Sequence, residues 1–254
     1  MKNKSNEKTA KIKTSFTAGK LTNYSGALPV YKFMEKIGLP ALLNRTSIKL
    51  HHNAKYESGD IFSLIMLGIA SGLNRIKKIE TFSRDPLIKE IFGIKEKIDE
   101  DTLSNRIKRY GMRQTNELMD VIGAASKKVH KKLGTEGDIL DIDSTPKVVY
   151  GKQEGAEKGF NHEKKGARSY HPLMAFLNSS RECLLSWLRP GDAYTSNNAA
   201  EFLKQSFEML SGSIKYLLVR ADRGFFDDKI ISQIESRPHT GYIIKVKMKR
   251  PSDI

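Results

Sequence analysis

Cysteine and long apolar runs are nearly absent from this chain of 254 residues. The single cysteine, Cys183, excludes an internal disulfide and is typical of a protein from a reducing compartment. The longest apolar run, residues 61–70, contains a serine and a glycine and is too short to span a bilayer. The lysine-rich N-terminus has no apolar segment behind it, which argues against a secretory signal. We therefore expect a cytoplasmic protein without a membrane partner.

Acidic residues are also scarce relative to basic ones. Asp and Glu number 29 against 44 Lys and Arg, which gives a formal net charge of +15 and a pI of about 9.7. Such an excess of positive charge favours a polyanionic partner, most simply nucleic acid. A generally basic protein, such as a ribosomal one, is the alternative, but the apolar stretches of the chain speak against it.

Three segments of the chain differ in composition. Residues 1–20 are polar and rich in lysine, which predicts a disordered basic arm. Residues 21–135 carry apolar side chains at helical spacing and are expected to form an all-α, DNA-binding region. From Gly137 the period changes to that of strands, so residues 136–254 are expected to form an α/β core.

Residues 99–110 are the strongest candidate for a DNA contact within the helical region. Acidic residues stand at the start of this segment and basic residues at its end, an order that suits the helix dipole. With the preceding short helix it could form a helix-turn-helix motif in which Arg106, Lys108 and Arg109 contact phosphates rather than bases. An ordinary amphipathic helix with a solvated basic face is an equally weighted alternative.

Two aspartates stand at the ends of apolar strands. Residues 138–145 are expected to form a buried strand that stops at Pro146, which lacks a backbone donor, and that carries Asp143 to its tip. Residues 214–221 form a second apolar run, typical of a strand covered on both faces, and Asp222 follows directly. Each aspartate alone could simply cap a turn at the surface. Two such aspartates, each at the end of a buried strand, favour a functional site over two unrelated surface caps.

The expected order beyond Gly137 is three strands, of which the second spans residues 169–178, then helix, strand, helix and strand. If the first and fourth strands are neighbours, Asp143 and Asp222 meet at the strand ends, where open α/β sheets place ligands. Two close carboxylates repel each other unless a cation lies between them, and oxygen ligands suit Mg²⁺ or Mn²⁺. Such ions can activate a water or a 3′-hydroxyl at a phosphodiester, and the positive surface would hold the DNA.

Five motifs occur in the second half of the chain: Asp141-Ile-Asp143-Ser-Thr-Pro, Gly151-Lys-Gln-Glu-Gly155-Ala-Glu-Lys-Gly159-Phe-Asn, Ser169-Tyr-His-Pro-Leu, Arg189-Pro-Gly-Asp192-Ala and Arg220-Ala-Asp222-Arg-Gly-Phe-Phe-Asp227. Together they resemble a DDE transposase of bacterial insertion sequences, and most of all the insertion sequence 1380 group. The resemblance implies an α/β fold with a ribonuclease H-like mixed sheet and flanking helices. It also implies cut-and-paste transposition by metal-dependent phosphoryl transfer, with Asp143 and Asp222 as catalytic metal ligands. Asp141 shares the face of Asp143 but lies deeper in the sheet.

The same resemblance implies the partners of the protein. These are double-stranded DNA, in the form of transposon terminal inverted repeats and target DNA, and a second copy of the chain in a homodimer on paired ends. The location that follows is the bacterial cytoplasm, at the nucleoid.

One departure from the family pattern concerns the third acid, a glutamate on a helix after the last core strand. The sequence ends at Pro251-Ser-Asp-Ile254, just after that strand, so we expect a C-terminally truncated core with little or no strand-transfer activity. Asp192 and Glu201 are acids elsewhere in the chain, but their spacing does not make them substitutes. Two alternatives remain open. A non-catalytic inhibitor of transposition would bind DNA without cutting it, and a complete ribonuclease H-like nuclease would need further core carboxylates.

Further basic residues are candidates for contacts with DNA phosphates. The polar stretch of residues 147–168 is expected to be a loop that orders on DNA, because it is too long for an idle connection. Lysines of the last strand either line a DNA channel or protect an edge strand from aggregation. Arg223 either holds a phosphate or pairs with Asp227 or Asp228. The full set is Lys152, Lys158, Lys164, Lys165, Arg168, Arg223, Lys245 and Lys247.

Overall fold

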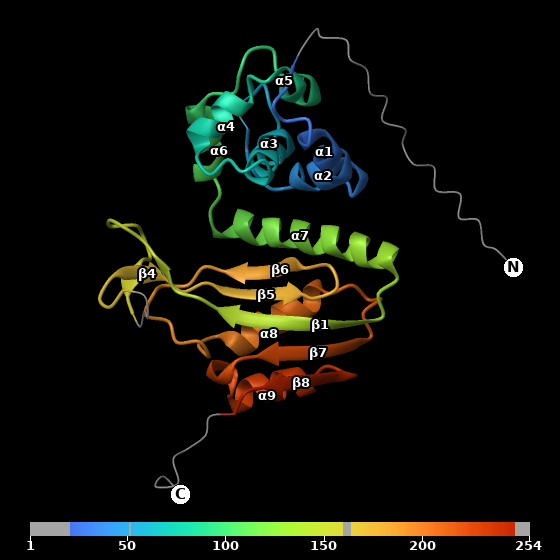
Figure 1. Ribbon diagram of the computed structural model, residues 1–254, viewed down its shortest axis with the longest axis vertical. Helices are drawn as coiled ribbons and strands as arrows, with labels where there is room; N and C mark the ends of the chain where they lie inside the picture. Colours follow the sequence, from blue (N-terminus) through green and yellow to red (C-terminus); the bar gives the residue numbers. More distant parts are fainter. Residues whose placement is uncertain (1–20, 51, 160–163, 247–254) are drawn as a thin grey trace, which may run out of the picture.

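The computed structural model describes residues 21–50, 52–159 and 164–246 of the chain. A group of short helices lies on one side of the long helix α7 (Met112–Leu133), and an α/β part lies on its other side (Figure 1). The basic arm expected over residues 1–20 lies outside the described residues. No helix in the described ranges is long and apolar enough to cross a lipid bilayer.

The helical part is built from amphipathic helices around a core of their own. Apolar side chains from five helices are buried against one another, and among them Leu64, Phe82 and Leu103 are fully buried. A second, smaller cluster around Met34 and Val121 joins the first helices to α7. The helices that precede α7 are α1 (Ala27–Lys36), α2 (Leu39–Leu43), α3 (Ser58–Ala70), α4 (Ile76–Phe82), α5 (Pro86–Phe92) and α6 (Glu100–Lys108).

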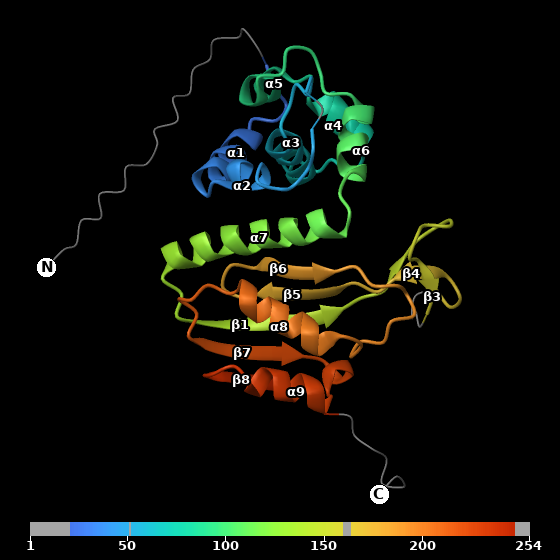
Figure 2. The same cartoon turned by 180° about the vertical axis from the view of Figure 1, so that it is seen from behind.

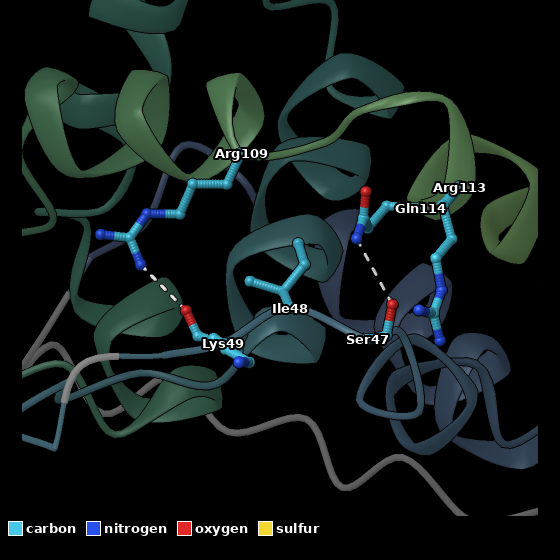
Figure 3. Close-up of a pocket in the computed structure, with 6 residues that line it drawn as sticks. All are labelled: Ser47, Ile48, Lys49, Arg109, Arg113 and Gln114. Carbon is cyan, nitrogen blue, oxygen red and sulfur yellow. Dashed lines mark hydrogen bonds between the residues drawn. The ribbon is translucent and has the colours of Figure 1, made fainter.

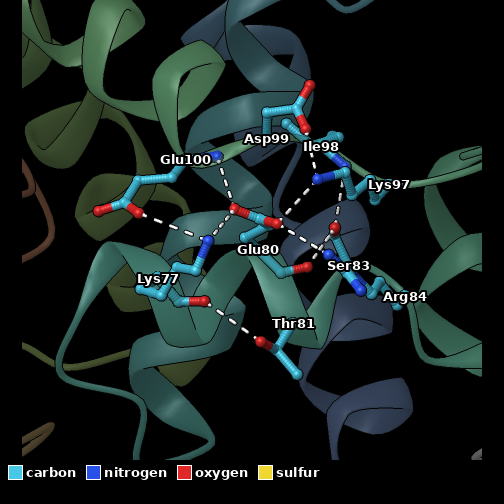
Figure 4. Close-up of polar contacts among 9 residues, drawn as sticks. All are labelled: Lys77, Glu80, Thr81, Ser83, Arg84, Lys97, Ile98, Asp99 and Glu100. Atoms are coloured by element: carbon cyan, nitrogen blue, oxygen red, sulfur yellow. Dashed lines mark hydrogen bonds and ion pairs between the residues drawn. The ribbon is translucent and has the colours of Figure 1, made fainter.

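A buried carboxylate holds one side of the helical part together (Figure 4). The side chain of Glu80 in α4 is 4% exposed and accepts hydrogen bonds from Lys97 and Arg84 at 2.9 Å and from Lys77 at 3.1 Å. It also accepts the backbone N–H of Glu100, at the start of α6. These donors, Lys97 first, hold the pKa of Glu80 far below its ordinary value near 4.5. A carboxylate with this many donors is stabilised in spite of its burial.

The main sheet has the strand order β6-β5-β1-β7-β8. Strand β5 runs antiparallel to its neighbours β1 and β6, whereas β7 is parallel to both β1 and β8. The strands are β1 (Gly137–Ser144), β5 (Leu173–Leu177), β6 (Glu182–Trp187), β7 (Tyr216–Ala221) and β8 (Thr240–Ile244). This mixed sheet, preceded by an all-α part, confirms the ribonuclease H-like α/β class expected from the sequence.

Two helices cover one face of the sheet. Helices α8 (Ala199–Met209) and α9 (Asp228–Glu235) lie side by side on the face that Figure 2 turns toward the viewer. Phe202 and Ile234 from these helices pack on Leu140 and Val219, which are fully buried. Helix α7 contacts both the edge strand β6 and helix α8, and Met119 of α7 packs against the same core cluster. In the described part of the chain no helix covers the opposite face, which Figure 1 shows from the front.

A small second sheet takes the place of the expected loop between the first two strands. The sequence predicts a polar loop over residues 147–168, but the described residues of this stretch include strands of a sheet with the order β2-β4-β3. Its strands are β2 (Lys147–Val148), β3 (Glu157–Lys158) and β4 (Arg168–Tyr170). The strand expected over residues 169–178 is therefore divided into β4 and β5. The division falls at Pro172, because proline donates no hydrogen bond to a sheet.

We expect Glu80→Gln to lower the Tm by roughly 5 °C or more, because three cationic side chains lose the charge that they share. Thermal unfolding followed by circular dichroism measures this change. Glu35→Gln is the matched control, since Glu35 is an exposed partner of Lys32 and should shift the Tm little.

The original chain and Glu80→Gln should also differ in their stability toward acid. Because folding lowers the pKa of Glu80, its contribution is present above the unfolded value near 4.5 and is lost as the pH falls below it. The stability of the original chain should therefore fall more steeply below pH 4.5 than that of Glu80→Gln. The free energy of unfolding can be measured by urea titration at several pH values. If it falls equally with pH in both proteins, the role assigned to Glu80 is contradicted.

Candidate functional site

Asp143 and Asp222 lie at the carboxyl ends of two neighbouring parallel strands. The pairing of β1 with β7 ends at Ile142 and Ala221, and each aspartate is the next residue of its strand. Leu140 and Ile142 of β1 point into the core, so the alternation of side chains places Asp143 on the open face of the sheet. Both aspartates are exposed. The structure thus brings together the two acids that the sequence analysis selected.

Backbone N–H groups hold one oxygen of each carboxylate. Asp143 Oδ1 accepts the N–H of Ser144 at 2.7 Å. Asp222 Oδ1 accepts the N–H of Gly224 at 2.8 Å, where Asp222 caps the short 3-10 helix η1 (Arg223–Phe225). Among the described residues, the Oδ2 atoms of both aspartates have no hydrogen-bond partner. Each side chain is therefore oriented by its own turn and keeps one oxygen available to a ligand.

Asp141, one row deeper on the open face, is engaged by an arginine. Arg220 donates from Nε to Asp141 Oδ1 at 2.6 Å and from Nη2 to Oδ2 at 2.7 Å, a two-pronged ion pair across β1 and β7. This contact raises the pKa of Arg220. Because both oxygens of Asp141 are occupied, Asp143 is the carboxylate of β1 that remains available.

The donor set at the strand ends suits a small, hard cation. Exposed carboxylate oxygens are ligands that Mg²⁺ and Mn²⁺ accept, and both ions retain waters at their other positions. Within the described residues, no three His, Cys, Asp or Glu side chains come together as a group that could hold a metal ion. Glu201 pairs with Lys204 at 4.0 Å on the exposed side of α8. The described site therefore offers a pair of carboxylates, Asp143 and Asp222.

Arg106 corrects the expected DNA-binding set. It is 8% exposed, and its guanidinium donates to the carbonyl of Tyr56 at 3.1 Å and to Ser58 Oγ at 3.3 Å. Burial lowers the pKa of Arg106. The side chain ties α6 to the start of α3, so its hydrogen bonds are spent within the helical part. Lys108 and Arg109, at the end of α6, are exposed as expected.

Arg109 also lines a cleft that the sequence did not reveal (Figure 3). The cleft has a volume of about 480 Å³ and lies where the chain passes from α6 into α7. Arg109 donates to the backbone carbonyl of Lys49 at 3.1 Å. Arg113 pairs with Glu117 at 3.2 Å on one side. The lining residues are Ser47, Ile48, Lys49, Arg109, Arg113 and Gln114. Three cations around one cleft form a positive surface on the helical part.

The remaining basic candidates lie close to the carboxylates or on the small sheet. Arg223 is exposed directly beside Asp222, and no ion pair joins it to Asp227 or Asp228 within the described residues. Lys245 is exposed just beyond β8, and Lys247 lies outside the described residues. The five cations predicted on the small-sheet segment are all exposed, and they are Lys152, Lys158, Lys164, Lys165 and Arg168.

Two of these cations have contacts within the segment itself. Lys164 Nζ lies 5.0 Å from the centre of the Tyr150 ring, and Arg168 donates to the carbonyl of Ala156 at 3.2 Å. The segment thus carries its positive charge on an ordered backbone. Contact with DNA by any of these residues stays a prediction.

Comparison with solved structures finds transposases that bear a distant likeness to this chain. A piggyBac transposase synaptic complex with hairpin DNA is 12% identical, with a TM-score of 0.43, over 89% of this chain and 52% of that chain. A Mos1 transposase paired-end complex is 12% identical over 77% of this chain and 61% of that one, with a TM-score of 0.31. A Mos1 mariner paired-end complex with Mn is 11% identical over 85% and 66%, with a TM-score of 0.28. The chain thus spans about half the length of the piggyBac transposase.

Comparison with curated protein sequences returns no match. The family model described as transposase DDE domain group 1 matches residues 4–251. Because this match extends over nearly the whole sequence, the chain belongs to the DDE transposase family.

Proposed function

We propose that the chain is a transposase of a bacterial insertion sequence of the 1380 group, by family an enzyme of metal-dependent phosphoryl transfer at the transposon ends, and that its own strand-transfer activity is low because the described site offers only two carboxylates. The observation that carries this proposal is the placement of Asp143 beside Asp222 at the ends of β1 and β7. Membership of the DDE transposase family supports the reaction class. The proposal places the protein in the bacterial cytoplasm, at the nucleoid where its DNA lies.

In this proposal Asp143 and Asp222 would hold Mg²⁺ or Mn²⁺. The ion would supply activation of the attacking hydroxyl and stabilisation of the leaving oxygen. The protein's own contribution is to fix the carboxylates by the Ser144 and Gly224 N–H groups before any ligand arrives. Arg223, exposed beside Asp222, is suited to a phosphate of the scissile strand. The Arg220–Asp141 pair cancels charge behind the site, so the attraction for cations is concentrated at the tips.

The positive surfaces give the DNA two places to lie. We propose that the cleft lined by Lys49, Arg109 and Arg113 contacts the phosphate backbone of a terminal inverted repeat. We further propose that the small sheet, with its exposed lysines, contacts DNA near the strand ends, because β1 leads directly into it. A homodimer that pairs the two ends would bring a second set of these surfaces, as the family resemblance implies.

A second candidate function is a DNA-binding inhibitor of transposition. It is favoured by the fact that the described residues bring two carboxylates together rather than three. In this role the basic surfaces occupy transposon ends, and strand transfer by the chain alone is weak or absent. Binding of terminal-repeat DNA without Mg²⁺-dependent cleavage would support the inhibitor, whereas robust cleavage would support the active transposase.

The metal site can be tested by Mn²⁺ titration, with free Mn²⁺ measured by electron paramagnetic resonance. Asp143→Asn or Asp222→Asn should each weaken Mn²⁺ binding by about tenfold or more, because each removes one of two charged ligands. Asp228→Asn is the control, since it removes an equal charge from the exposed first turn of α9. Equal Mn²⁺ affinity in all four proteins would refute the site.

The DNA surface can be tested with a triple variant, Lys49→Ala, Arg109→Ala and Arg113→Ala. Binding to a fluorescent DNA duplex should weaken. The slope of the logarithm of the association constant against the logarithm of the salt concentration should become shallower by roughly 0.9 for each DNA phosphate that the variant no longer neutralises. The control replaces Lys36, Lys78 and Lys204 with alanine, which changes the net charge equally outside the cleft. If both triple variants show the same decrease in affinity, the cleft has no special role and only net charge matters.

A further inference from the structure

A short loop before α8 touches the turns that follow both strand tips. In this loop Thr195 Oγ1 lies 3.3 Å from Ser144 Oγ, and the Ser144 N–H donates to Asp143. The methyl group of Thr195 lies against Gly224, whose N–H donates to Asp222. One side chain therefore contacts the capping residue of each of the two carboxylates.

Gly224 owes its identity to this contact and not to an unusual backbone angle. A Cβ atom at position 224 would stand 2.9 Å from Thr195 Cγ2, 3.1 Å from Thr195 Cβ and 3.0 Å from Asp222 Oδ1. Real Cβ atoms do not come this close to a methyl group, so any larger residue must push Thr195 or the Asp222 carboxylate away. The backbone of Gly224 itself has no positive φ that would require glycine.

A buried arginine holds the loop in place. Arg189 is 7% exposed and donates from Nη1 to the carbonyls of Asn197, Tyr194 and Thr195 at 2.9, 3.1 and 3.3 Å. Its Nε donates to the carbonyl of His171 at 3.1 Å, and His171 Nδ1 lies 2.7 Å from the carbonyl of Ala193 at the start of the loop.

No acid compensates the charge of Arg189 among these contacts, and its Nη2 is buried without a partner in the described structure. Burial of a cation whose only partners are carbonyls lowers the stability of the fold. The presence of Arg189 therefore indicates that the shape of the loop matters.

We propose that Thr195, held by Arg189, is a positioning residue that fixes the Asp143 and Asp222 carboxylates at the spacing required by one shared divalent cation. The inference rests on the metal site of the proposed function. Two carboxylates repel each other before the cation binds, and the contacts of Thr195 with Ser144 and Gly224 oppose their separation. A site that is preorganised in this way binds its ion without reordering the two turns.

The test uses Gly224→Ala, the double variant Gly224→Ala with Thr195→Ser, and Gly212→Ala as a control with open space around its Cβ position. Mn²⁺ affinity, measured by electron paramagnetic resonance, should fall about tenfold in Gly224→Ala, as for other residues that support metal ligands. Thr195→Ser removes the methyl group, the nearest of the three atoms that a Cβ at position 224 would meet, and keeps the hydroxyl, so the double variant should recover part of the affinity. Gly212→Ala should bind Mn²⁺ like the original chain.

A second measurement needs no metal. Hydrogen exchange of the residue-224 amide, followed by nuclear magnetic resonance in the metal-free protein, reports its hydrogen bond to Asp222. Exchange should be about tenfold faster in Gly224→Ala and should slow again in the double variant.

The two measurements separate failure of the metal site from failure of the positioning role. If the original chain binds no Mn²⁺ through Asp143 and Asp222, the proposed metal site fails, and unchanged exchange at residue 224 would overturn the contact as well. If Asp143→Asn weakens Mn²⁺ binding but Gly224→Ala does not, the metal site stands and the positioning role of Thr195 is overturned.

Discussion

The parallel pairing of β1 with β7 is the interaction on which the candidate site depends. Its register aligns Ile142 with Ala221 and therefore sets Asp143 beside Asp222. A shift of one residue would turn one of the two aspartates toward the core, because successive side chains of a strand point to opposite faces. The buried residues of the two strands, packed under α8 and α9, make such a shift costly. The hydrophobic core thus determines the geometry of the polar site.

The two halves of the molecule solve the problem of buried charge in different ways. In the helical part, Glu80 is surrounded by three cations and one backbone N–H, and its charge is fully compensated. In the α/β part, Arg189 donates to backbone carbonyls alone, and its Nη2 has no partner in the described structure. The first arrangement stabilises the fold, whereas the second gives up stability to shape a loop beside the carboxylates.

Much of the core was accessible from local sequence patterns. Apolar runs and the break at Pro146 located β1, and the order of strands and helices indicated the sheet that the structure contains. The two aspartates could be chosen because each followed a buried strand. Their proximity depended on which strands are neighbours, and that is a property of tertiary structure.

Other features could not be read from local patterns. Arg106 stands three residues after the buried Leu103 and so shares its face of α6, but its partner, the carbonyl of Tyr56, is distant in the sequence and could not be located from local patterns. The role of Thr195 depends on contacts across 51 residues of chain. Pro172 did carry a usable signal, since a proline within an expected strand argues for a break.

The direct passage from β1 into the small sheet has a mechanical consequence. Only Thr145 and Pro146 separate the end of β1 from β2, and proline restricts the backbone on both sides of itself. The small sheet carries exposed lysines. The connection from this sheet to Asp143 has few freely rotating backbone angles that could accommodate a displacement of the sheet. A movement of the small sheet should therefore shift the position of Asp143, because the connection between them is short and contains a proline.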